Sequence, residues 1–163
     1  MKPTSSSGPQ LLAFTALLMV GALLALPTLL QGATVAAQRG EQHELADLYL
    51  GRMIKVWAED ASAADVEALG ELLAENVAYE HPRVGIRVEG RRALLDAMGR
   101  FLGASRGPRV AGVEVLVGTQ VVVLAFDLTI DIRDGEEWTP IDRRQVVVLA
   151  TEGGLITGIS DHW

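Results

Sequence analysis

The spacing of apolar residues predicts an amphipathic helix over residues 41–59. Large apolar side chains in this range recur mostly at intervals of three and four residues: Leu45, Leu48, Tyr49, Met53, Val56 and Trp57. Because an α-helix completes a turn in about 3.6 residues, this spacing places them on one face. The pattern therefore predicts a helix with one side turned toward a core.

Two further helices are predicted downstream. Ser62 and Asp65 have the spacing of a capping box, in which two side chains bond reciprocally to the backbone at a helix start. This second helix is expected to end at Asn76, and its apolar residues are Val66, Leu69, Leu72 and Leu73. A third helix is predicted to begin near Gly90, with an apolar stripe of Leu94, Leu95, Met98, Phe101 and Leu102.

Beyond Pro108 the apolar period changes to about 2, which is typical of β-strands. Four segments rich in β-branched residues are separated by short turns that contain glycine: 110–117, 120–132, 138–150 and 155–163. Residues 77–88 contain Pro82 and Gly85 and are predicted to form two short extended pieces. Helices followed by hairpin-connected strands indicate an α+β fold in which the helices pack in the curve of the sheet.

The first part of the chain has the pattern of a targeting segment. Residues 11–30 contain no charged side chain, and about 20 apolar residues are enough to span a bilayer. Lys2 precedes this run, and small residues precede Gln38. Residues 1–37 are therefore predicted to be a signal peptide, or alternatively an N-terminal membrane anchor. The expected location is secreted or periplasmic, or membrane-anchored if the leader is retained.

Charge and cysteine content restrict the function further. The net charge is −7, and removal of the leader with Lys2 makes it −8, which disfavours binding to nucleic acid or to anionic lipid. The chain contains no cysteine, so disulfides, thiolate nucleophiles and zinc thiolates are excluded. The three histidines lack the spacing of a metal motif, and no glycine-rich phosphate loop follows a strand. We therefore expect no metal and no cofactor.

Two short segments, each at the end of a predicted strand, are the main candidates for a functional site. Tyr79 and His81 point to the same face of an extended strand because side chains alternate along it. Asp161 and Trp163 share a face of the last predicted strand for the same reason. The two segments are about eighty residues apart and would meet only if the fold brings their strands together. Alternatively, His81 ends a strand with its ring half in water, and Trp163 is a plug of the core.

The order of these elements resembles the nuclear transport factor two-like fold from about residue 41 to residue 163. A Tyr-x-polar-Pro segment in a short hairpin and a final Asp-aromatic pair carry the resemblance. Within that fold the chain is similar to SnoaL-like polyketide cyclases, ketosteroid isomerases and limonene-epoxide hydrolases. The resemblance implies a cone-like α+β barrel, with three N-terminal helices packed in the concave face of a strongly curved antiparallel sheet. It also implies a conical pocket for apolar substrates.

The resemblance assigns roles to single residues. Tyr79 and His81 match a Tyr and an Asn that hold water in the hydrolases, so the second position departs from the pattern. His81 also matches the isomerase position of the proton-abstracting Asp. Asp161 and Asp127 match the two hydrolase acids. In the hydrolases an arginine completes this set of two acids, and its position falls on Ala125 in this sequence.

The hydrolase and the isomerase activities each consequently lack one of the residues that the resemblance requires. Arg143 or Arg144 would have to replace the missing hydrolase arginine, and the isomerase's second Asp falls near Gln145. Proton transfer is the chemistry that remains. Histidine has a reference pKa near 6.5, so a neutral His81 oriented by Asp161 or Asp127 can act as a general base. Tyr79 would donate to a developing enolate.

The face to which Asp127 belongs is open at this point. Asp127, Thr129 and Asp131 share one side of their strand, and the other side is uniformly apolar. The alternation alone turns the aspartates toward solvent or a dimer partner, whereas the resemblance turns Asp127 into the pocket. In the second case the apolar side would be an outer face that dimerises.

The expected function is that of an exported SnoaL-like protein that binds a small apolar molecule. The activity would be that of a cofactor-free isomerase, cyclase or hydrolase with His/Asp acid–base chemistry. Tyr49, Trp57 and Trp163 are the candidate ligand-binding residues, although the first two have the spacing of core residues. The alternative is a non-catalytic ligand-binding or dimeric interaction module. A homodimer is expected from the resemblance and from the apolar strand faces.

Overall fold

The computed structural model describes residues 36–163, so the apolar run at residues 11–30 lies outside the described part. The first helix covers residues 36–56. The elements that follow are α2 (Ala63–Gly70), β1 (Leu73–His81), β2 (Ile86–Glu89), α3 (Arg91–Gly99), β3 (Ser105–Val117), β4 (Val121–Asp134), β5 (Glu137–Glu152) and β6 (Leu155–His162). Contacts along the chain separate residues 39–163 as one compact unit.

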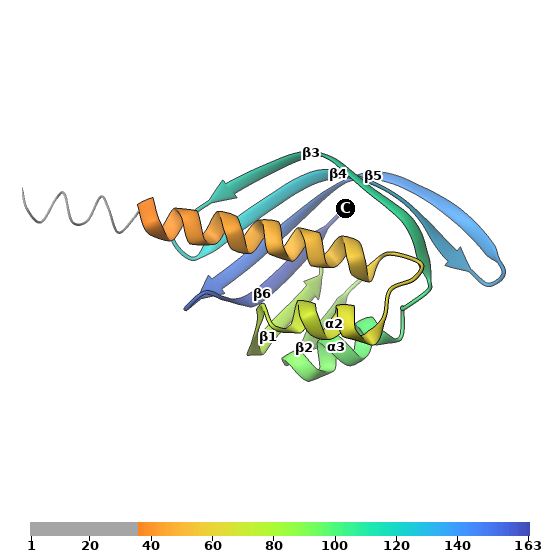
Figure 1. Cartoon of the computed structure of the whole chain (residues 1–163), viewed down its shortest axis with the longest axis horizontal. Coiled ribbons are helices and arrows are strands. Elements are labelled where there is room, and N and C mark those ends of the chain that lie inside the picture. The colour runs from red at the N-terminus through yellow and green to blue at the C-terminus, as the bar shows by residue number, and fades with distance from the viewer. Residues whose placement is uncertain (1–35) are drawn as a thin grey trace, which may run out of the picture. The chain divides into compact units, whose positions relative to one another are not determined.

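The six described strands form one curved sheet in the order β2-β1-β6-β5-β4-β3. Strands β3 to β6 are joined in sequence as antiparallel neighbours, which confirms the predicted meander. Strand β1 pairs with β2 in a hairpin and with β6 in parallel, so the sheet is mixed. The first helix crosses the concave side of the sheet, and α2 and α3 lie beside β1 and β2 (Figure 1). The predicted α+β class is confirmed.

The first helix buries the face that its spacing predicts, with one exchange. Its buried apolar residues are Leu45, Ala46, Tyr49, Leu50, Met53 and Val56. Leu48 was expected on this face but is 43% exposed, whereas Leu50 is buried. The helix also ends at residue 56, three residues earlier than predicted. With 3.6 residues per turn, position 48 falls outside the arc of the helix that the buried residues occupy.

The second helix is shorter than predicted. Ser62 and Asp65 do form the capping contact, because the Ser62 backbone N–H and hydroxyl both donate to Asp65 Oδ2, at 2.9 and 2.6 Å. The expected continuation to Asn76 is wrong, since α2 ends at Gly70 and β1 begins at Leu73. A side chain at position 70 would meet a Leu95 methyl carbon at 2.7 Å, so glycine permits α2 and α3 to approach closely.

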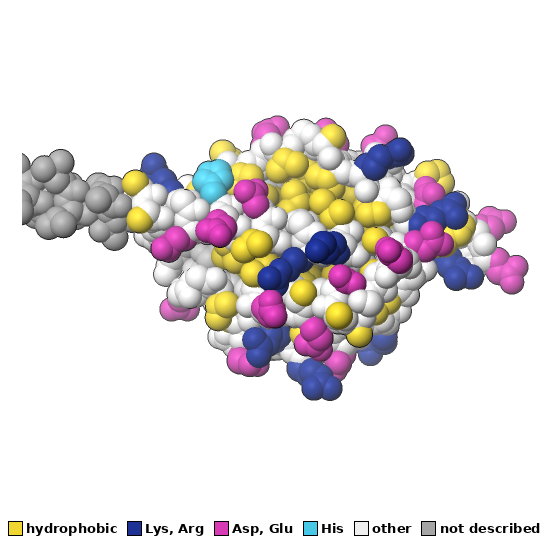
Figure 2. All heavy atoms as spheres, viewed as in Figure 1, with side chains coloured by type: hydrophobic (Ala, Val, Ile, Leu, Met, Phe, Trp, Pro, Cys, Tyr) yellow, Lys and Arg dark blue, Asp and Glu magenta, His cyan; other side chains and the backbone are white. Residues whose placement is uncertain are grey.

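The core lies between the helices and the inner face of the sheet. Its most deeply buried large side chains come from α2, β1, β4, β5 and β6: Leu69, Leu73, Leu124, Phe126, Leu128, Leu149 and Ile156. On β4, the apolar side faces this core, so the suggestion that it forms an outer dimerising face is wrong. Figure 2 shows one face of the molecule, where apolar side chains are grouped among interspersed acidic and basic ones.

Candidate active site

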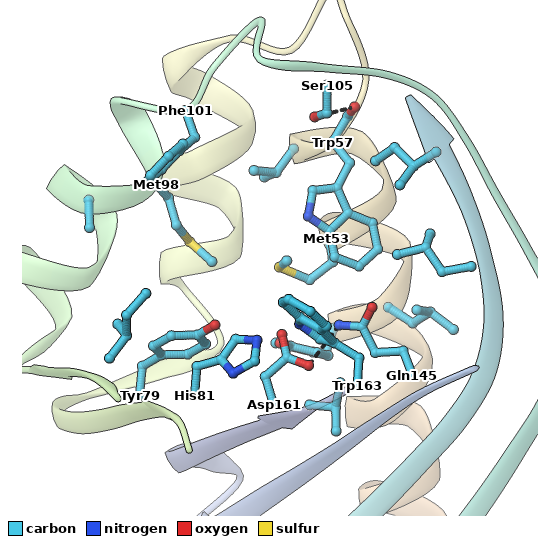
Figure 3. A pocket seen from close by; sticks show the side chains of 18 of the residues that line it. Met53, Trp57, Tyr79, His81, Met98, Phe101, Ser105, Gln145, Asp161 and Trp163 are labelled. Carbon is cyan, nitrogen blue, oxygen red and sulfur yellow. Dashed lines mark hydrogen bonds between the residues drawn. The ribbon is translucent and has the colours of Figure 1, made fainter. Parts of the chain in front are cut away.

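A cavity of about 350 Å³ lies between the first helix, α3 and the inner face of the sheet. Apolar side chains make most of its wall, including Met53, Val56, Leu94, Met98, Phe126 and Leu128. Figure 3 shows Met53 and Met98 reaching into it from the two helices, opposite a group of polar side chains. A volume of this size is in the lower part of the range for small-molecule sites.

The polar side chains grouped at one end of the cavity come mainly from β1, β5 and β6. In the parallel pair, Tyr79 lies opposite Ile159 and Glu80 opposite Ser160. His81 and Asp161 are the next residues along the two strands, and both line the cavity together with Tyr79. The parallel pairing thus brings together the two segments that the sequence singled out, although they are eighty residues apart.

Asp161 is the only carboxylate among the described residues that line the cavity. Its Oδ1 accepts a hydrogen bond of 2.7 Å from Nε2 of Gln145, which is itself 1% exposed (Figure 3). Burial raises the pKa of Asp161, and the bond from Gln145 and electrostatic interactions with the nearby His81 and Arg143 side chains only partly offset this. The carboxylate is therefore a stronger base than one in water.

Tyr79 and Tyr49 lie close to this carboxylate. Burial, and then the negative charge and hydrogen bonding of Asp161, raise the pKa of Tyr79 to about 12. Burial is also the main reason why the pKa of Tyr49 lies well above its usual value, and the Asp161 charge adds to it. Both phenols consequently keep their protons at neutral pH and remain donors.

His81 is 4% exposed and has no hydrogen-bond partner among the described residues for either ring nitrogen. Its ring lies edge-on to Trp163, with the ring centres 4.6 Å apart. The expectation that Asp161 orients His81 is not met, because neither ring nitrogen of His81 forms a hydrogen bond with Asp161. Two buried nitrogens are therefore left for a bound molecule to satisfy.

Asp127 does not belong to this site, which corrects the role that the resemblance suggested. It is exposed on the outer face of β4, where its Oδ1 accepts a bond of 3.2 Å from Arg144 Nη1. Phe126 and Leu128, its neighbours along the strand, line the cavity instead. Strand alternation fixes this result, since one face of β4 is entirely apolar and is buried.

Arg143 and Gln145 both line the cavity, although neither was among the predicted site residues. The guanidinium carbon of Arg143 lies 3.9 Å from the centre of the Trp163 ring. Burial lowers the pKa of Arg143, and the charge of Asp161 opposes this. The signal was present in the alternation of β5: Val147 and Leu149 are buried, so residues two and four positions before Val147 share their face.

The predicted ligand-binding residues Tyr49, Trp57 and Trp163 all line the cavity. Trp57 is additionally fixed by its main-chain oxygen, which accepts a bond of 2.9 Å from the Ser105 hydroxyl.

Within residues 36–163, no group of three or more His, Asp or Glu side chains is placed to hold a metal ion. No helix in the same range is long and apolar enough to cross a membrane.

Comparisons with known proteins agree with this architecture. A candidate polyketide cyclase from Xanthomonas campestris superposes with a TM-score of 0.64 at 17% identity, covering 77% of this chain and 92% of the other. An epoxide hydrolase of M. tuberculosis, similar to limonene-epoxide hydrolases, gives 0.58 at 15% identity, with 76% and 82% covered.

A nuclear transport factor two-like protein from Anabaena variabilis gives a TM-score of 0.60 at 12% identity, covering 75% of this chain and 88% of the other. At these identities the superpositions establish the fold alone. No curated protein matches the sequence significantly. The SnoaL-like domain family matches residues 51–159, and with two thirds of its length inside that match the chain belongs to the SnoaL-like domain family.

Proposed function

We propose that the protein binds a small, mainly apolar molecule in the cavity and changes it by acid–base chemistry without a cofactor. The observation that carries the proposal is Asp161, a carboxylate of raised pKa in an otherwise mainly apolar cavity. Groups with strongly shifted pKa values are concentrated at functional sites. The similar structures include a candidate cyclase and an epoxide hydrolase, which supports an isomerase, cyclase or hydrolase activity.

Asp161 is assigned the role of proton acceptor in this proposal. A general base works best when its pKa approaches the working pH, and burial moves Asp161 in that direction. Gln145 donates to one carboxylate oxygen, and the carboxylate has further lone pairs that can accept a proton of the substrate or of a water molecule. Proton abstraction next to a carbonyl and activation of water toward an epoxide share this first step.

Tyr79 and His81 are assigned to the negative charge that develops on the substrate. Tyr79 keeps its proton at neutral pH because its pKa is about 12, and its phenol can donate to an oxyanion. The ring nitrogens of His81 have no partner among the described residues, so a substrate oxygen would satisfy one of them. Donors placed in advance in a dry site need little rearrangement during the reaction.

An NMR titration tests the proposal. The Asp161 carboxyl and the His81 ring are followed against pH, with and without a panel of small apolar ketones and epoxides. We expect Asp161 to titrate above its reference value of 3.8 and both signals to move with ligand. Asp127, on the outer face, serves as the internal control and should not respond to ligand. The proposal would be contradicted if the pKa of Asp161 equalled its reference value of 3.8 and did not change with any compound of the panel.

A second candidate function, a non-catalytic ligand-binding or dimeric interaction module, is favoured by one observation. His81 has no carboxylate partner among residues 36–163, so the base–orienter pair of many general-base sites is missing. Binding of panel compounds without any conversion, followed by chromatography over long incubation, would support this candidate over the enzyme.

We also propose that the protein forms a homodimer through the outer face of β4 and β5. Part of this face consists of small apolar side chains on the two neighbouring strands, beside the Asp127–Arg144 pair: Val121, Val123, Ala125, Val146 and Val148. A second copy can cover this face with the same residues around a two-fold axis, which is the commonest symmetry of homodimers.

The proposal also includes export of the chain, or its anchoring to a membrane, which the apolar run at residues 11–30 supports.

Val148→Glu is expected to convert the dimer to a monomer, because it places a buried charge in the centre of the interface. Val84→Glu is the matched control, since Val84 is 51% exposed in the turn between β1 and β2. Sedimentation velocity over a range of protein concentrations measures both. A wild-type chain that sediments as a monomer at all concentrations would disprove the dimer.

A further inference from the structure

Two arginines lie against the same tryptophan at the polar end of the cavity. The guanidinium carbon of Arg143 is 3.9 Å from the centre of the Trp163 ring, and that of Arg83 is 5.5 Å away. Arg83 also donates a bond of 2.8 Å from Nη1 to the main-chain oxygen of Trp163. Trp163 lines the cavity and is 36% exposed, so both cations lie where the cavity meets solvent.

Neither arginine forms an ion pair with an acidic side chain in the described part of the chain. Six other arginines there form ion pairs with acidic side chains: Arg52, Arg87, Arg91, Arg92, Arg106 and Arg144. Arg143 donates a long side-chain hydrogen bond, 3.5 Å from Nη2 to Gln145 Oε1, and its buried Nε has no partner among residues 36–163. A half-buried cation without an ion-pair partner in direct contact is costly, and a bound anion would offset that cost.

His81 adds a second, independent observation at the same place. The His81 ring lies against the Trp163 ring, which both arginines also contact. His81 is 4% exposed, and neither of its ring nitrogens has a hydrogen-bond partner among residues 36–163. Asp161 acts on Arg143 through its charge, and no hydrogen bond or ion pair between the two side chains is present, so the guanidinium keeps donors for another acceptor. Strand β6 ends opposite Val146, so Arg143 lies beyond the end of that strand, toward the opening.

We propose that the ligand is an apolar monocarboxylic acid whose carboxylate is held by Arg143, assisted by Arg83 and His81. This inference rests on the proposed function and specifies the substrate class of the same site. The planar guanidinium fork matches a carboxylate in geometry and gives charge-assisted hydrogen bonds. The apolar body then lies between Met53, Met98 and Leu128, and its reacting atoms lie near Asp161.

The local arginines are needed because the whole chain is acidic. A net charge of −7 repels a monoanion at long range, so an anion would bind only where positive charge is uncompensated. The cavity of about 350 Å³ is mainly apolar, which disfavours highly charged phosphate compounds. Most of their charged oxygens would lose their water without gaining a partner in the cavity. A single carboxylate on an apolar body fits both conditions.

The test compares 1-naphthylacetate with its neutral analogue 1-naphthylacetamide by isothermal titration calorimetry on the 163-residue chain. We expect the acid to bind about tenfold or more tightly than the amide, the range for one charge-assisted contact. Arg143→Gln should reduce the preference to within about twofold, and Arg143→Lys should restore part of it. Arg144→Gln is the matched control: the next residue of β5 faces outward and pairs with Glu114.

The outcomes separate this inference from the function on which it rests. Equal binding of acid and amide, unchanged in Arg143→Gln, would overturn the carboxylate assignment and leave the apolar pocket intact. A preference for the acid that Arg144→Gln abolishes and Arg143→Gln does not would overturn it as well. Binding of neither compound, nor of any ketone or epoxide of the NMR panel, would overturn the proposed function together with it.

Discussion

Asp161→Asn is expected to lower the rate of the proposed conversion by about 10²–10⁴-fold, the usual contribution of a positioned general base. Asparagine has nearly the same shape, and its carbonyl oxygen can still accept the bond from Gln145, which is 2.7 Å in the wild type. The amide cannot take up a proton near neutral pH, so binding should persist while conversion is lost. Rates under saturating substrate, compared with ligand affinity by calorimetry, measure the two effects separately.

The same substitution is expected to raise the free energy of unfolding at neutral pH. Burial raises the pKa of Asp161 in the folded state, so the folded protein binds this proton more tightly than the unfolded chain does. The stabilisation from this group is complete below the unfolded pKa, near 3.8, and is lost as pH rises through the folded pKa. Wild type therefore pays for an ionised, desolvated carboxylate at pH 7, whereas Asp161→Asn does not.

Urea unfolding of both proteins between pH 3 and pH 8 measures this difference. The stability gained by Asp161→Asn should grow as pH rises from about 3.8 and then become constant. Asp127→Asn, on the outer face of β4, is the control for a change of charge without burial. Parallel stability curves for wild type and Asp161→Asn across this range would contradict the assignment of a destabilised carboxylate.

Leu149→Ala is expected to lower the free energy of unfolding by about 2–5 kcal/mol. Leu149 is 0% exposed in the central strand β5, between Val122 and Ile159 of the neighbouring strands. Removal of its side chain loses the transfer free energy of three carbon atoms and leaves a void that rigid neighbouring strands fill poorly. Urea unfolding followed by circular dichroism gives the difference.

Leu116→Ala is the matched control on the same sheet, because Leu116 is 70% exposed near the end of β3. Its effect should stay within about 0.5 kcal/mol, as for most exposed positions. If both leucine variants lost similar stability, the division of this sheet into a buried inner face and an outer face would be wrong.

The elements with local signals were predictable from the sequence. The first helix follows from its apolar spacing, and the strands after Pro108 follow from their alternation and glycine-containing turns. Ser62 and Asp65 form the expected capping contact. In each case the interactions that select the structure lie within a few residues of one another, so a single sequence contains them.

The start of β1 was not predictable in this way. Leu72 and Leu73 continue the helical spacing of α2, yet the chain becomes extended there, and Ile156 N–H donates to the Leu72 oxygen at 2.8 Å. The partner that selects the strand lies more than eighty residues away. Tertiary pairing therefore decides the conformation of a segment whose local pattern suits either structure.

The site was partly predictable for a related reason. Tyr79, His81 and Asp161 were found from residue type and strand alternation, but their meeting depends on the parallel pairing of β1 with β6. Arg143 and Asp127 required knowledge of which side of the sheet is covered by helices. Alternation assigns residues to two sides, and only the packed structure identifies the inner one.

The position of β6 in the sheet has a consequence for how the molecule assembles. It lies between β1 and β5, so the β1–β2 hairpin and the β3–β4–β5 meander share no strand pairing until β6 enters. Until then β1 and β5 both expose unpaired backbone edges, which invite pairing with other chains. Among the described strands β6 comes latest in the chain, and it closes two open edges and delivers Asp161 to the site in one step. Newly made chains should be most prone to aggregate just before it emerges.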